Sequence, residues 1–428
     1  MDYRAVIQQG LDYIEDNLRA DITAEDLAGQ AGFSLYHYYR LFQAATGLPV
    51  MQYILRRRLL HGIYAIRQGS GKTDAALDYG FDTYAGFYKA FRREFGCPPS
   101  AFLKSCRAHR PYRINLMQEE HIMITQKKAA QILGRWGMED QPIRSIYYES
   151  TGRRNENVYD VGGQYVLKFT AHPEGMKNHI RVSKAIGQAG LLAAVPLPAL
   201  DGAEIVREGE LYFCLFRRLE GKPMTAAGFY GESGPDDARQ TGEAIGRLHQ
   251  ALSGIEPCVN DADLLETVAK KALPQAGALL GLSEAFCQTY LDTFGALYAR
   301  LPRQVIHRDP NPSNIIRSGD QWGFIDFELS ERNARIYDPC YAATAILSET
   351  FGRDNDRWLT IFHRIIEGYD SAARLTPEEK KAVPYVLLAN QLVCVSWFAG
   401  REKFAEQFQA NKRMTLWLLD HLDAMQIP

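Results

Sequence analysis

Two short segments in the second half of the chain constrain its fold more than any other part of the sequence. They run Val305-Ile306-His307-Arg308-Asp309-Pro310-Asn311-Pro312-Ser313-Asn314 and Gly323-Phe324-Ile325-Asp326-Phe327-Glu328. Each contains an apolar, strand-like run, so a carboxylate (Asp309), a carboxamide (Asn314) and a second carboxylate (Asp326) are expected beside strand ends. Phosphoryl transfer from a metal-bound nucleotide requires this set. One acid orients or deprotonates the attacking hydroxyl, while an amide and a second acid hold the divalent ions.

The spacing of these residues matches a known family. His-Arg-Asp-x-x-x-x-Asn, from His307 to Asn314, is the pattern of the catalytic loop in protein-kinase-like folds. Further matching segments are Asn157-Val158-Tyr159, Leu167-Lys168, Leu219-Glu220-Gly221 and Asp338-Pro339. Residues from about 126 to 400 therefore resemble the aminoglycoside phosphotransferase/choline kinase-like family of small-molecule kinases. The resemblance implies a two-lobed α+β fold, with an amino-terminal lobe (N-lobe) at 126–222 and a carboxy-terminal lobe (C-lobe) at 223–428.

The resemblance also implies roles for individual residues. Asp309 is expected to be the catalytic base, with Asn314 and Asp326 as ligands of Mg²⁺. Lys168 lies inside an apolar strand, where a lysine is costly unless an anion meets it, and in kinase folds the nucleotide phosphates are that anion. The nucleotide is expected to be ATP or GTP, and the residues expected to contact it are Lys168, Gly152 and Asn157.

The departures from the kinase pattern narrow the expected substrate. Glu328 stands where protein kinases have the glycine of Asp-Phe-Gly, and no Ala-Pro-Glu follows. Both features argue against a protein kinase with a phosphorylated activation loop. The turn before Asn157 has a single glycine, Gly152, and the helix expected to supply a glutamate partner for Lys168 has Asn178-His179 instead.

Hydrophobic patterning predicts the remaining elements of the two lobes. Strands are expected at Ile143–Glu149, Asn157–Val161, Tyr165–Phe169 and Leu211–Leu219. Helices are expected at Gly175–Ala189 and Ala238–Ala251, and again after Leu279.

The first hundred residues contain an internal repeat. Ala31-Gly32-Phe33-Ser34 leads to Gly47-Leu48-Pro49, and Tyr79-Gly80-Phe81-Asp82 leads to Gly96-Cys97-Pro98. Each copy predicts a helix-turn-helix unit, with first helices at Ala24–Ala31 and Thr73–Tyr79. Ser34 and either Asp82 or Thr83 are expected to cap the second helices. Val50–Ile66 is expected to be a connecting helix that carries Arg56-Arg57-Arg58.

This repeat resembles the DNA-binding domain of AraC/XylS-type transcription regulators, which has two helix-turn-helix units on one linker helix. The resemblance covers residues from about 5 to 105, and it places the domain first in the chain, whereas the family usually has it last. It implies binding of double-stranded DNA through the second helix of each unit. The residues expected to face the groove are Tyr36, Tyr39, Arg40, Tyr84, Tyr88 and Lys89. Each tyrosine has the alternative of packing on the linker helix, and the whole repeat has the alternative of a helical protein-interaction module.

Length and composition agree with a multidomain, cytoplasmic protein. At 428 residues the chain exceeds the usual size of a single core. Seven scattered cysteines without a CxxC pair favour a reducing compartment, and the most apolar stretch, Tyr385–Ala399, is broken by Asn390 and Gln391, so no membrane association is expected. Residues 1–113 hold 15 Lys and Arg against 11 Asp and Glu, a net charge of +4, which suits a phosphate backbone as partner. The expected domain limits are 1–108 for the DNA-binding domain (the head) and 109–125 for a linker.

Three functions are compatible with these observations. The first is a DNA-binding regulator fused to a small-molecule kinase that phosphorylates a hydroxyl group. In the second, the kinase fold only senses a nucleotide or ligand, and the whole chain is a regulator. The third is a drug-resistance kinase with a vestigial head, which would require the arginines of the head to be dispensable.

Overall fold

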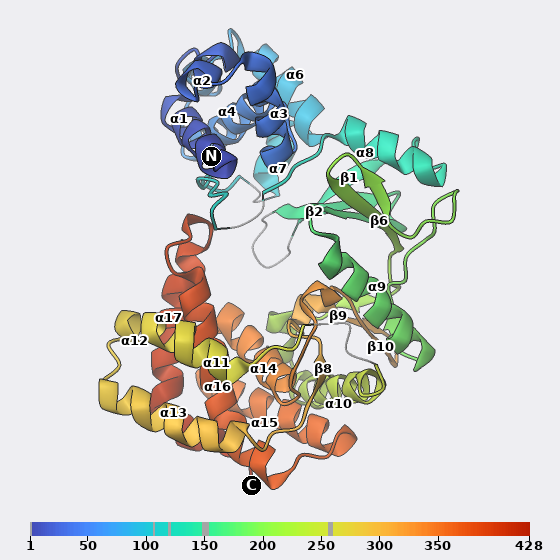
Figure 1. The fold of residues 1–428 in the computed structure, drawn as a ribbon, viewed down its shortest axis with the longest axis vertical. Helices are drawn as coiled ribbons and strands as arrows, with labels where there is room; N and C mark the ends of the chain where they lie inside the picture. Colours follow the sequence, from blue (N-terminus) through green and yellow to red (C-terminus); the bar gives the residue numbers. More distant parts are fainter. Residues whose placement is uncertain (1, 106–107, 119–120, 148–153, 256–259) are drawn as a thin grey trace. The chain divides into compact units, whose positions relative to one another are not determined.

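The computed structural model describes residues 2–105, 108–118, 121–147, 154–255 and 260–428. The chain divides into two compact units, Met1–His172 with Pro196–Arg218, and Pro173–Val195 with Leu219–Pro428. The first unit contains the head and a five-stranded sheet, and the second contains the C-lobe (Figure 1).

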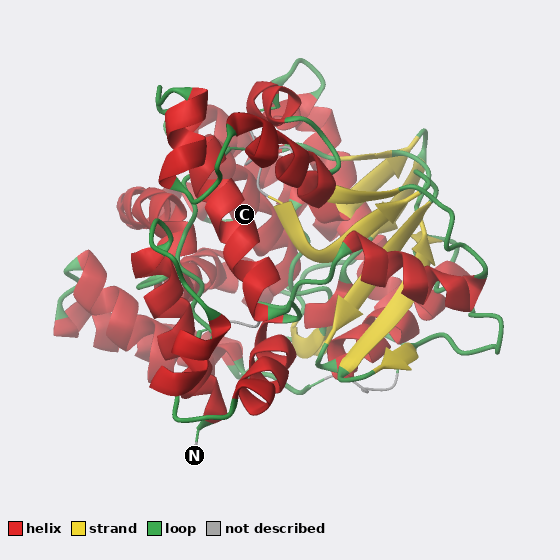
Figure 2. Cartoon of the chain, turned by 90° about the horizontal axis from the view of Figure 1, so that it is seen from above, coloured by secondary structure: helices red, strands yellow, loops and turns green. Residues whose placement is uncertain are grey.

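The described part of the head contains helices joined by turns and loops, and no strand. Figure 2 shows the helices, strands and loops of the whole chain. Its helices are α1 (Tyr3–Asn17), α2 (Ala24–Gln30), α3 (Leu35–Thr46), α4 (Val50–Arg67), α5 (Lys72–Asp78), α6 (Tyr84–Phe95) and α7 (Pro99–Lys104). The two predicted helix-turn-helix units, α2–α3 and α5–α6, and the connecting helix α4 are therefore confirmed.

Local sequence explains where the second helix of each unit begins and ends. The Ser34 hydroxyl caps α3 by accepting the backbone N–H of His37, and Thr83 caps α6 by accepting that of Gly86. Gly47 and Gly96 end the same helices with φ of 77° and 70°, a left-handed conformation that glycine adopts without strain. Each helix-turn-helix unit buries two aromatic side chains of its second helix. These are Tyr38 and Phe42 of α3, and Phe87 and Phe91 of α6.

The N-lobe sheet is antiparallel, with strand order β1-β2-β3-β6-β5. Its strands are β1 (Ile143–Tyr147), β2 (Arg154–Val161), β3 (Tyr165–Thr170), β5 (Val206–Glu208) and β6 (Leu211–Arg217). All four predicted strands are confirmed, with shifts of a few residues at their ends; the predicted residues 148 and 149 lie outside the described residues. One face of the sheet packs with α8 (Gln126–Leu133) and a short 3₁₀ helix, Gly134–Trp136, around Leu167, Phe169 and Phe213.

Residues 109–125, predicted as a linker and here called the strap, contribute side chains to two cores. Ile114, Leu116 and Met123 are buried among the helices of the head. Ile122 and Ile124 are buried beneath the N-lobe sheet. The backbone N–H of Met123 also donates to the carbonyl of Thr46, at the end of α3, over 2.9 Å. The strap therefore holds the head and the sheet together by burial of apolar surface.

The second unit is mostly helical, with two small sheets. Its helices are α9 (Pro173–Gln188), α10 (Gly234–Leu252), α11 (Leu264–Thr267), α12 (Leu273–Leu280), α13 (Glu284–Tyr298), α14 (Tyr337–Thr350), α15 (Asn355–Ala372), α16 (Pro377–Phe398) and α17 (Ala405–Asp420). One sheet has the order β4-β10-β9-β7, with strands Leu192–Ala193, Gln321–Phe324, Ile315–Ser318 and Lys222–Pro223; the other pairs β8 (Arg303–Ile306) with β11 (Glu331–Ala334). The predicted helices α9 and α10, and helices after Leu279, are confirmed.

Two glycines bring α10 and α15 into close contact. A Cβ atom at Gly242 of α10 would lie 2.0 Å from the carbonyl oxygen of Ile365, and one at Gly368 of α15 would lie 1.9 Å from that of Arg239. The backbones of the two helices therefore touch where other residues would separate them.

Helix α16 is the central helix of the C-lobe. Among the described residues it alone has the length and apolar composition of a membrane span, but 61% of its most apolar window is buried. Its polar residues Asn390 and Gln391 are buried as well. Helices α12, α13, α14 and α17 pack around it, which is the environment of a core helix. The cysteines of the described residues, Cys97, Cys214, Cys287, Cys340 and Cys394, are all free thiols.

Candidate functional site

Asp338, in the first turn of α14, anchors the loop that follows β8. Its carboxylate is fully buried and accepts backbone hydrogen bonds from His307 over 2.7 Å and from Arg308 over 2.9 Å. Nε2 of His249 lies 2.9 Å from this carboxylate, and Nδ1 of the same ring lies 2.8 Å from the hydroxyl of Tyr369. Arg308 has a φ of 77°, a strained conformation for a residue with a side chain. The two hydrogen bonds to Asp338 hold the loop in that conformation.

Asp309, the predicted base, is oriented by its own loop. The side-chain amide of Asn311 donates to Oδ1 over 3.0 Å, and that of Asn314 donates to the backbone carbonyl over 2.9 Å and to Oδ2 over 3.3 Å. Burial raises the pKa of Asp309 above its ordinary value, and the nearby charge of Asp326 acts in the same direction. Hydrogen bonds from Asn311 and Tyr341 oppose this shift. A half-buried carboxylate of raised pKa is a stronger base than an exposed one.

Asn314 and Asp326, the predicted metal ligands, are joined through the backbone. The carbonyl of Asn314 accepts the N–H of Ile325 over 3.0 Å, directly before Asp326. Because the amide nitrogen of Asn314 donates to Asp309, its amide oxygen is the atom left to coordinate a cation. An amide oxygen and a carboxylate suit Mg²⁺, which proteins bind through few side chains together with substrate phosphates. The residues present therefore fit the ion.

Helix α9 contacts the second motif through a buried histidine. Nδ1 of His179 accepts the backbone N–H of Phe327 over 3.0 Å. This position was expected to supply the glutamate partner of Lys168. In this chain the residue instead fixes the backbone next to Asp326, whose own φ is 70°.

Lys168 lies in the middle of β3, in the compact unit that contains the head and the N-lobe sheet. It is paired with Val158 of β2 and with Cys214 of β6. Its neighbours Leu167 and Phe169 are buried in the sheet core. Because side chains alternate along a strand, Lys168 is on the opposite face of the sheet from that core.

Of the other two residues predicted to contact the nucleotide, only Asn157 is described. Gly152 lies outside the described residues. Asn157 is on β2 with a φ of 62°, a conformation that only a few per cent of non-glycine residues adopt. Its side-chain Oδ1 is buried without a hydrogen-bond partner among the described residues.

Helix α3 is the second helix of the first helix-turn-helix unit. It exposes two of its three residues that were predicted to contact DNA, Tyr36 and Arg40. Tyr36 is 73% exposed, and the guanidinium group of the exposed Arg40 lies 5.9 Å from its ring centre. Tyr39 is half-buried and packs against the hydrophobic core of the head. Tyr39 thus has packing contacts in the head, whereas Tyr36 is exposed.

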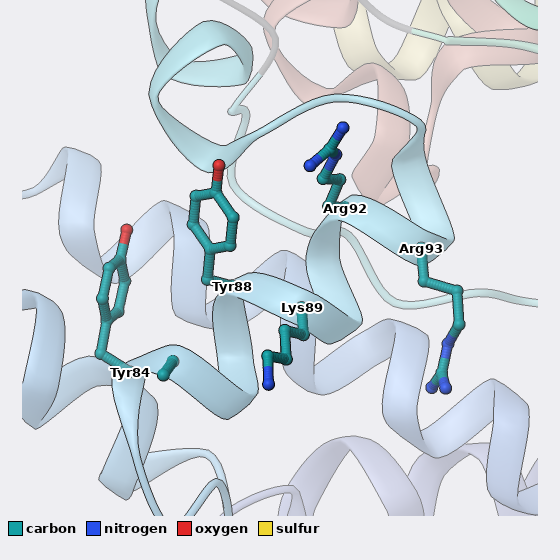
Figure 3. Close-up of a pocket in the computed structure, with 6 residues that line it drawn as sticks. Tyr84, Tyr88, Lys89, Arg92 and Arg93 are labelled. Carbon is teal, nitrogen blue, oxygen red and sulfur yellow. The ribbon is translucent and has the colours of Figure 1, made fainter.

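Helix α6, the second helix of the second helix-turn-helix unit, has a more basic surface. Tyr84, Tyr88, Lys89, Arg92 and Arg93 line a shallow depression along its solvent side (Figure 3). Tyr88 and Lys89 are exposed, whereas Tyr84 is half-buried and stacks on the buried Phe87. Arg92 and Arg93 were not assigned a role from the sequence, although helical spacing from Tyr88 and Lys89 would have placed them on this face.

The three consecutive arginines of α4 have structural roles. Arg56 pairs with Glu94 of α6, and Arg57 pairs with Glu15 of α1, all four side chains being largely buried. Arg58 donates to two backbone carbonyls at the end of α1 and in the following loop. Part of the positive charge counted in the head is therefore neutralised inside it.

Comparison with known proteins matches both halves of the chain. A model of a phosphotransferase enzyme family matches residues 150–375, and a model of a helix-turn-helix domain matches residues 27–105. The uncharacterized HTH-type transcriptional regulator YbfP of Bacillus subtilis is 32% identical over 103 residues, which are 24% of this chain and 35% of that protein. The HTH-type transcriptional activator AarP of Providencia stuartii is 31% identical over 99 residues, 23% of this chain and 73% of AarP. The chain spans about a third of the length of several such relatives.

Two solved structures share the fold over about 70% of the chain. A microcompartment-associated aminopropanol kinase aligns with a TM-score of 0.52 at 15% identity, over 70% of this chain and 98% of that one. An amicoumacin kinase in complex with AMP-PNP and Ca²⁺ aligns with a TM-score of 0.51 at 13% identity, over 68% and 95% of the two chains. At these identities the likeness concerns the fold.

Proposed function

The chain belongs to the phosphotransferase enzyme family and carries a helix-turn-helix domain of transcription regulators in front of it, and from this premise we propose a DNA-binding regulator with kinase activity. The kinase half transfers the γ-phosphoryl group of ATP or GTP to a hydroxyl group of a small molecule. The observation that carries the proposal is the loop in which Asn311 and Asn314 orient Asp309 while Asp338 holds the backbone.

In this proposal, Asp309 accepts the proton of the acceptor hydroxyl. Its raised pKa supports that role, and the amide of Asn311 keeps one carboxylate oxygen directed by a fixed hydrogen bond. Asn314 and Asp326 would hold Mg²⁺, Lys168 would hold the nucleotide phosphates, and Asn157 would contact the nucleotide. Bound Mg²⁺ supplies neutralisation of the charge on the phosphoryl group.

The chain after Asp326 supports a small-molecule acceptor. A single 3₁₀ turn, Phe327–Leu329, and the strand β11 fill the interval before α14 begins at Tyr337. Every residue of this interval is described, and it is too short to contain the activation segment that protein kinases use to bind a peptide.

In the head, the exposed residues of α3 and α6 are proposed to enter successive segments of the DNA major groove. The exposed cations Arg40, Lys89, Arg92 and Arg93 supply the contacts to phosphates or base edges. A DNA-binding regulator acts in the cytoplasm, where its operator is.

A second candidate is a regulator whose kinase fold binds a nucleotide without turnover. The observation that favours it is His179, which occupies the position expected for the glutamate and is engaged with the backbone of Phe327.

Nucleotide turnover by the purified full-length protein separates the two candidates. The acceptor panel contains aminoglycosides, macrolides, amino alcohols and sugars. We expect Asp309→Asn to lower turnover about 100-fold or more while nucleotide affinity in calorimetry stays near that of the wild type. Asp326→Ala should remove Mg²⁺-dependent nucleotide binding, and Asp320→Asn, in the exposed turn between β9 and β10, is the matched control. Binding without turnover across the panel would favour the sensor, and absence of any ATP or GTP binding would refute both.

A further inference from the structure

Glu156 on β2 joins the N-lobe sheet to the strap. Its Oε1 accepts a hydrogen bond from the hydroxyl of Tyr112 over 2.5 Å, and its Oε2 lies 3.2 Å from Nδ1 of His121. Tyr112 and His121 both belong to the strap, and their rings meet edge to face with centres 6.4 Å apart. One carboxylate of the sheet is thus hydrogen-bonded to one side chain of the strap and lies beside a second.

From the strap, hydrogen bonds continue into α4. The backbone carbonyl of Tyr112 accepts from the guanidinium group of Arg57 over 2.8 Å, and Arg57 is also paired with Glu15. The preceding residue of α4, Arg56, is paired with Glu94 of α6. The side chains of Arg57 and Glu15 are each 5% exposed, so solvent does little to screen these contacts.

The residue next to Glu156 combines two unfavourable features. Asn157 has a left-handed φ in the middle of a strand, and its buried Oδ1 has no hydrogen-bond partner among the described residues. Strained backbone persists where the surroundings hold it, and such sites are often the places that change on ligand binding. A buried polar atom without a partner gains most from a ligand that donates to it.

We propose that β2 couples nucleotide binding to DNA binding, with Glu156 and Tyr112 as the connection between the strand and the head. The inference rests on the proposed function, since it takes Asn157 as part of the nucleotide site and α6 as part of the DNA site. A nucleotide that engages Asn157 relieves its strain and shifts the adjacent Glu156, which is bound to the strap. The strap passes this shift to α4 through Arg57, and α4 holds α6 through Arg56. DNA and nucleotide therefore change each other's affinity by the same factor.

The test measures that factor in the full-length protein. The affinity for a duplex selected from a random library is determined by fluorescence anisotropy in Mg²⁺, with and without the non-hydrolysable analogue AMP-PNP. The affinity for AMP-PNP is determined by calorimetry with and without the duplex. We expect a change of about fivefold or more in each, equal within error.

Conservative variants show whether the coupling passes through the proposed contact. Tyr112→Phe and Glu156→Gln remove the hydrogen bond or the charge and keep the shapes, so each should retain both separate affinities while the coupling factor falls towards one. Asp160→Asn, which removes a different ion pair of β2, with Arg218, should leave the factor unchanged. Hydrogen exchange of α6 peptides on addition of AMP-PNP is a second readout, expected to change in the wild type and not in Tyr112→Phe.

The outcomes separate this inference from the proposed function. Absence of nucleotide or DNA binding by the wild type would overturn the proposed function and the coupling with it. Binding of both ligands with a coupling factor of one, or a factor that persists unchanged in the Tyr112→Phe and Glu156→Gln double variant, would overturn the coupling alone.

Discussion

Replacing Glu15 with Gln should loosen the head by an amount that the structure allows to be calculated. Burial opposes ionisation of Glu15, but hydrogen bonds from His61 and Arg57 outweigh it and lower the pKa from the ordinary 4.5 to about 2. This shift favours the ionised form in the folded state by about 3 kcal/mol, at ~1.4 kcal/mol for each pH unit. Gln resembles the protonated acid, so Glu15→Gln should lose about 3 kcal/mol at neutral pH. The value agrees with the ~3–5 kcal/mol typical of breaking a buried ion pair.

Hydrogen exchange of α1 and α4 peptides in the full-length protein is the suitable assay, because it reports on the head alone. At pH 7 the variant should exchange about 100-fold faster than the wild type, since ~1.4 kcal/mol corresponds to a factor of ten. The folded-state pKa is below the unfolded one, so the stabilisation is fully present above about pH 4.5 and is lost as the pH falls towards 2. At pH 3 about half of the difference should remain.

The neighbouring residue provides a matched control. Asp16 pairs with Arg113 at the surface, where the two side chains are 57% and 48% exposed. Exposed pairs contribute little, so Asp16→Asn should change exchange by no more than about fivefold. The reasoning is refuted if Glu15→Gln exchanges within threefold of the wild type, or if the two variants behave alike.

Three further predictions concern the loop, the DNA surface and the C-lobe. Asp338→Asn should lower turnover at nearly unchanged nucleotide affinity, because one of the two backbone groups loses its acceptor at a cost of about 1–3 kcal/mol; equal loss of both quantities would contradict a role confined to the loop. Lys89→Ala should reduce the slope of log DNA affinity against log salt concentration by about one unit, which corresponds to one phosphate contact. Arg40→Ala should relax base preference at one position if Arg40 reads a base edge. Binding titrations at several salt concentrations measure both effects. Gly242→Ala should destabilise the C-lobe by about 1–3 kcal/mol, because its methyl group meets the backbone of α15. Unfolding monitored by tryptophan fluorescence measures the loss. Gly277→Ala, where only a side chain is nearby, is the control and should be almost neutral.

Much of the fold follows from local sequence. The repeated Gly-Phe and Gly-x-Pro segments fix the two turns and helix ends of each helix-turn-helix unit, since left-handed positions select glycine. The alternation around Lys168 is enough to define β3 and its two faces. The loop from His307 to Asn314 is likewise compact enough for its internal contacts to follow from its own residues.

The contacts that escaped prediction join residues that are distant in the chain. Arg56 and Arg57 look like part of a basic surface until the fold places Glu94 and Glu15 against them. Asp338 was recognised as part of a motif, but its two backbone partners lie 31 and 30 residues earlier. In the strap, Met123 enters the core of the head, whereas its neighbours Ile122 and Ile124 enter the core beneath the sheet. Hydrophobic periodicity describes one element facing one core, so it cannot report such a segment.

The division of the strap between two cores also limits how such a protein can be rearranged in evolution. A recombination point just before Ile114 would remove Ile114, Leu116 and Met123 from the core of the head, and one just after Ile124 would remove Ile122 and Ile124 from the core beneath the sheet. Each buried aliphatic side chain contributes about 1.5–3 kcal/mol to stability, whereas the free energy of unfolding of a whole domain is only about 5–15 kcal/mol. The first cut would therefore destabilise the head, and the second would destabilise the sheet. An exchange of domains in this region is therefore expected to preserve stability only where the incoming partner covers the apolar side chains of the strap.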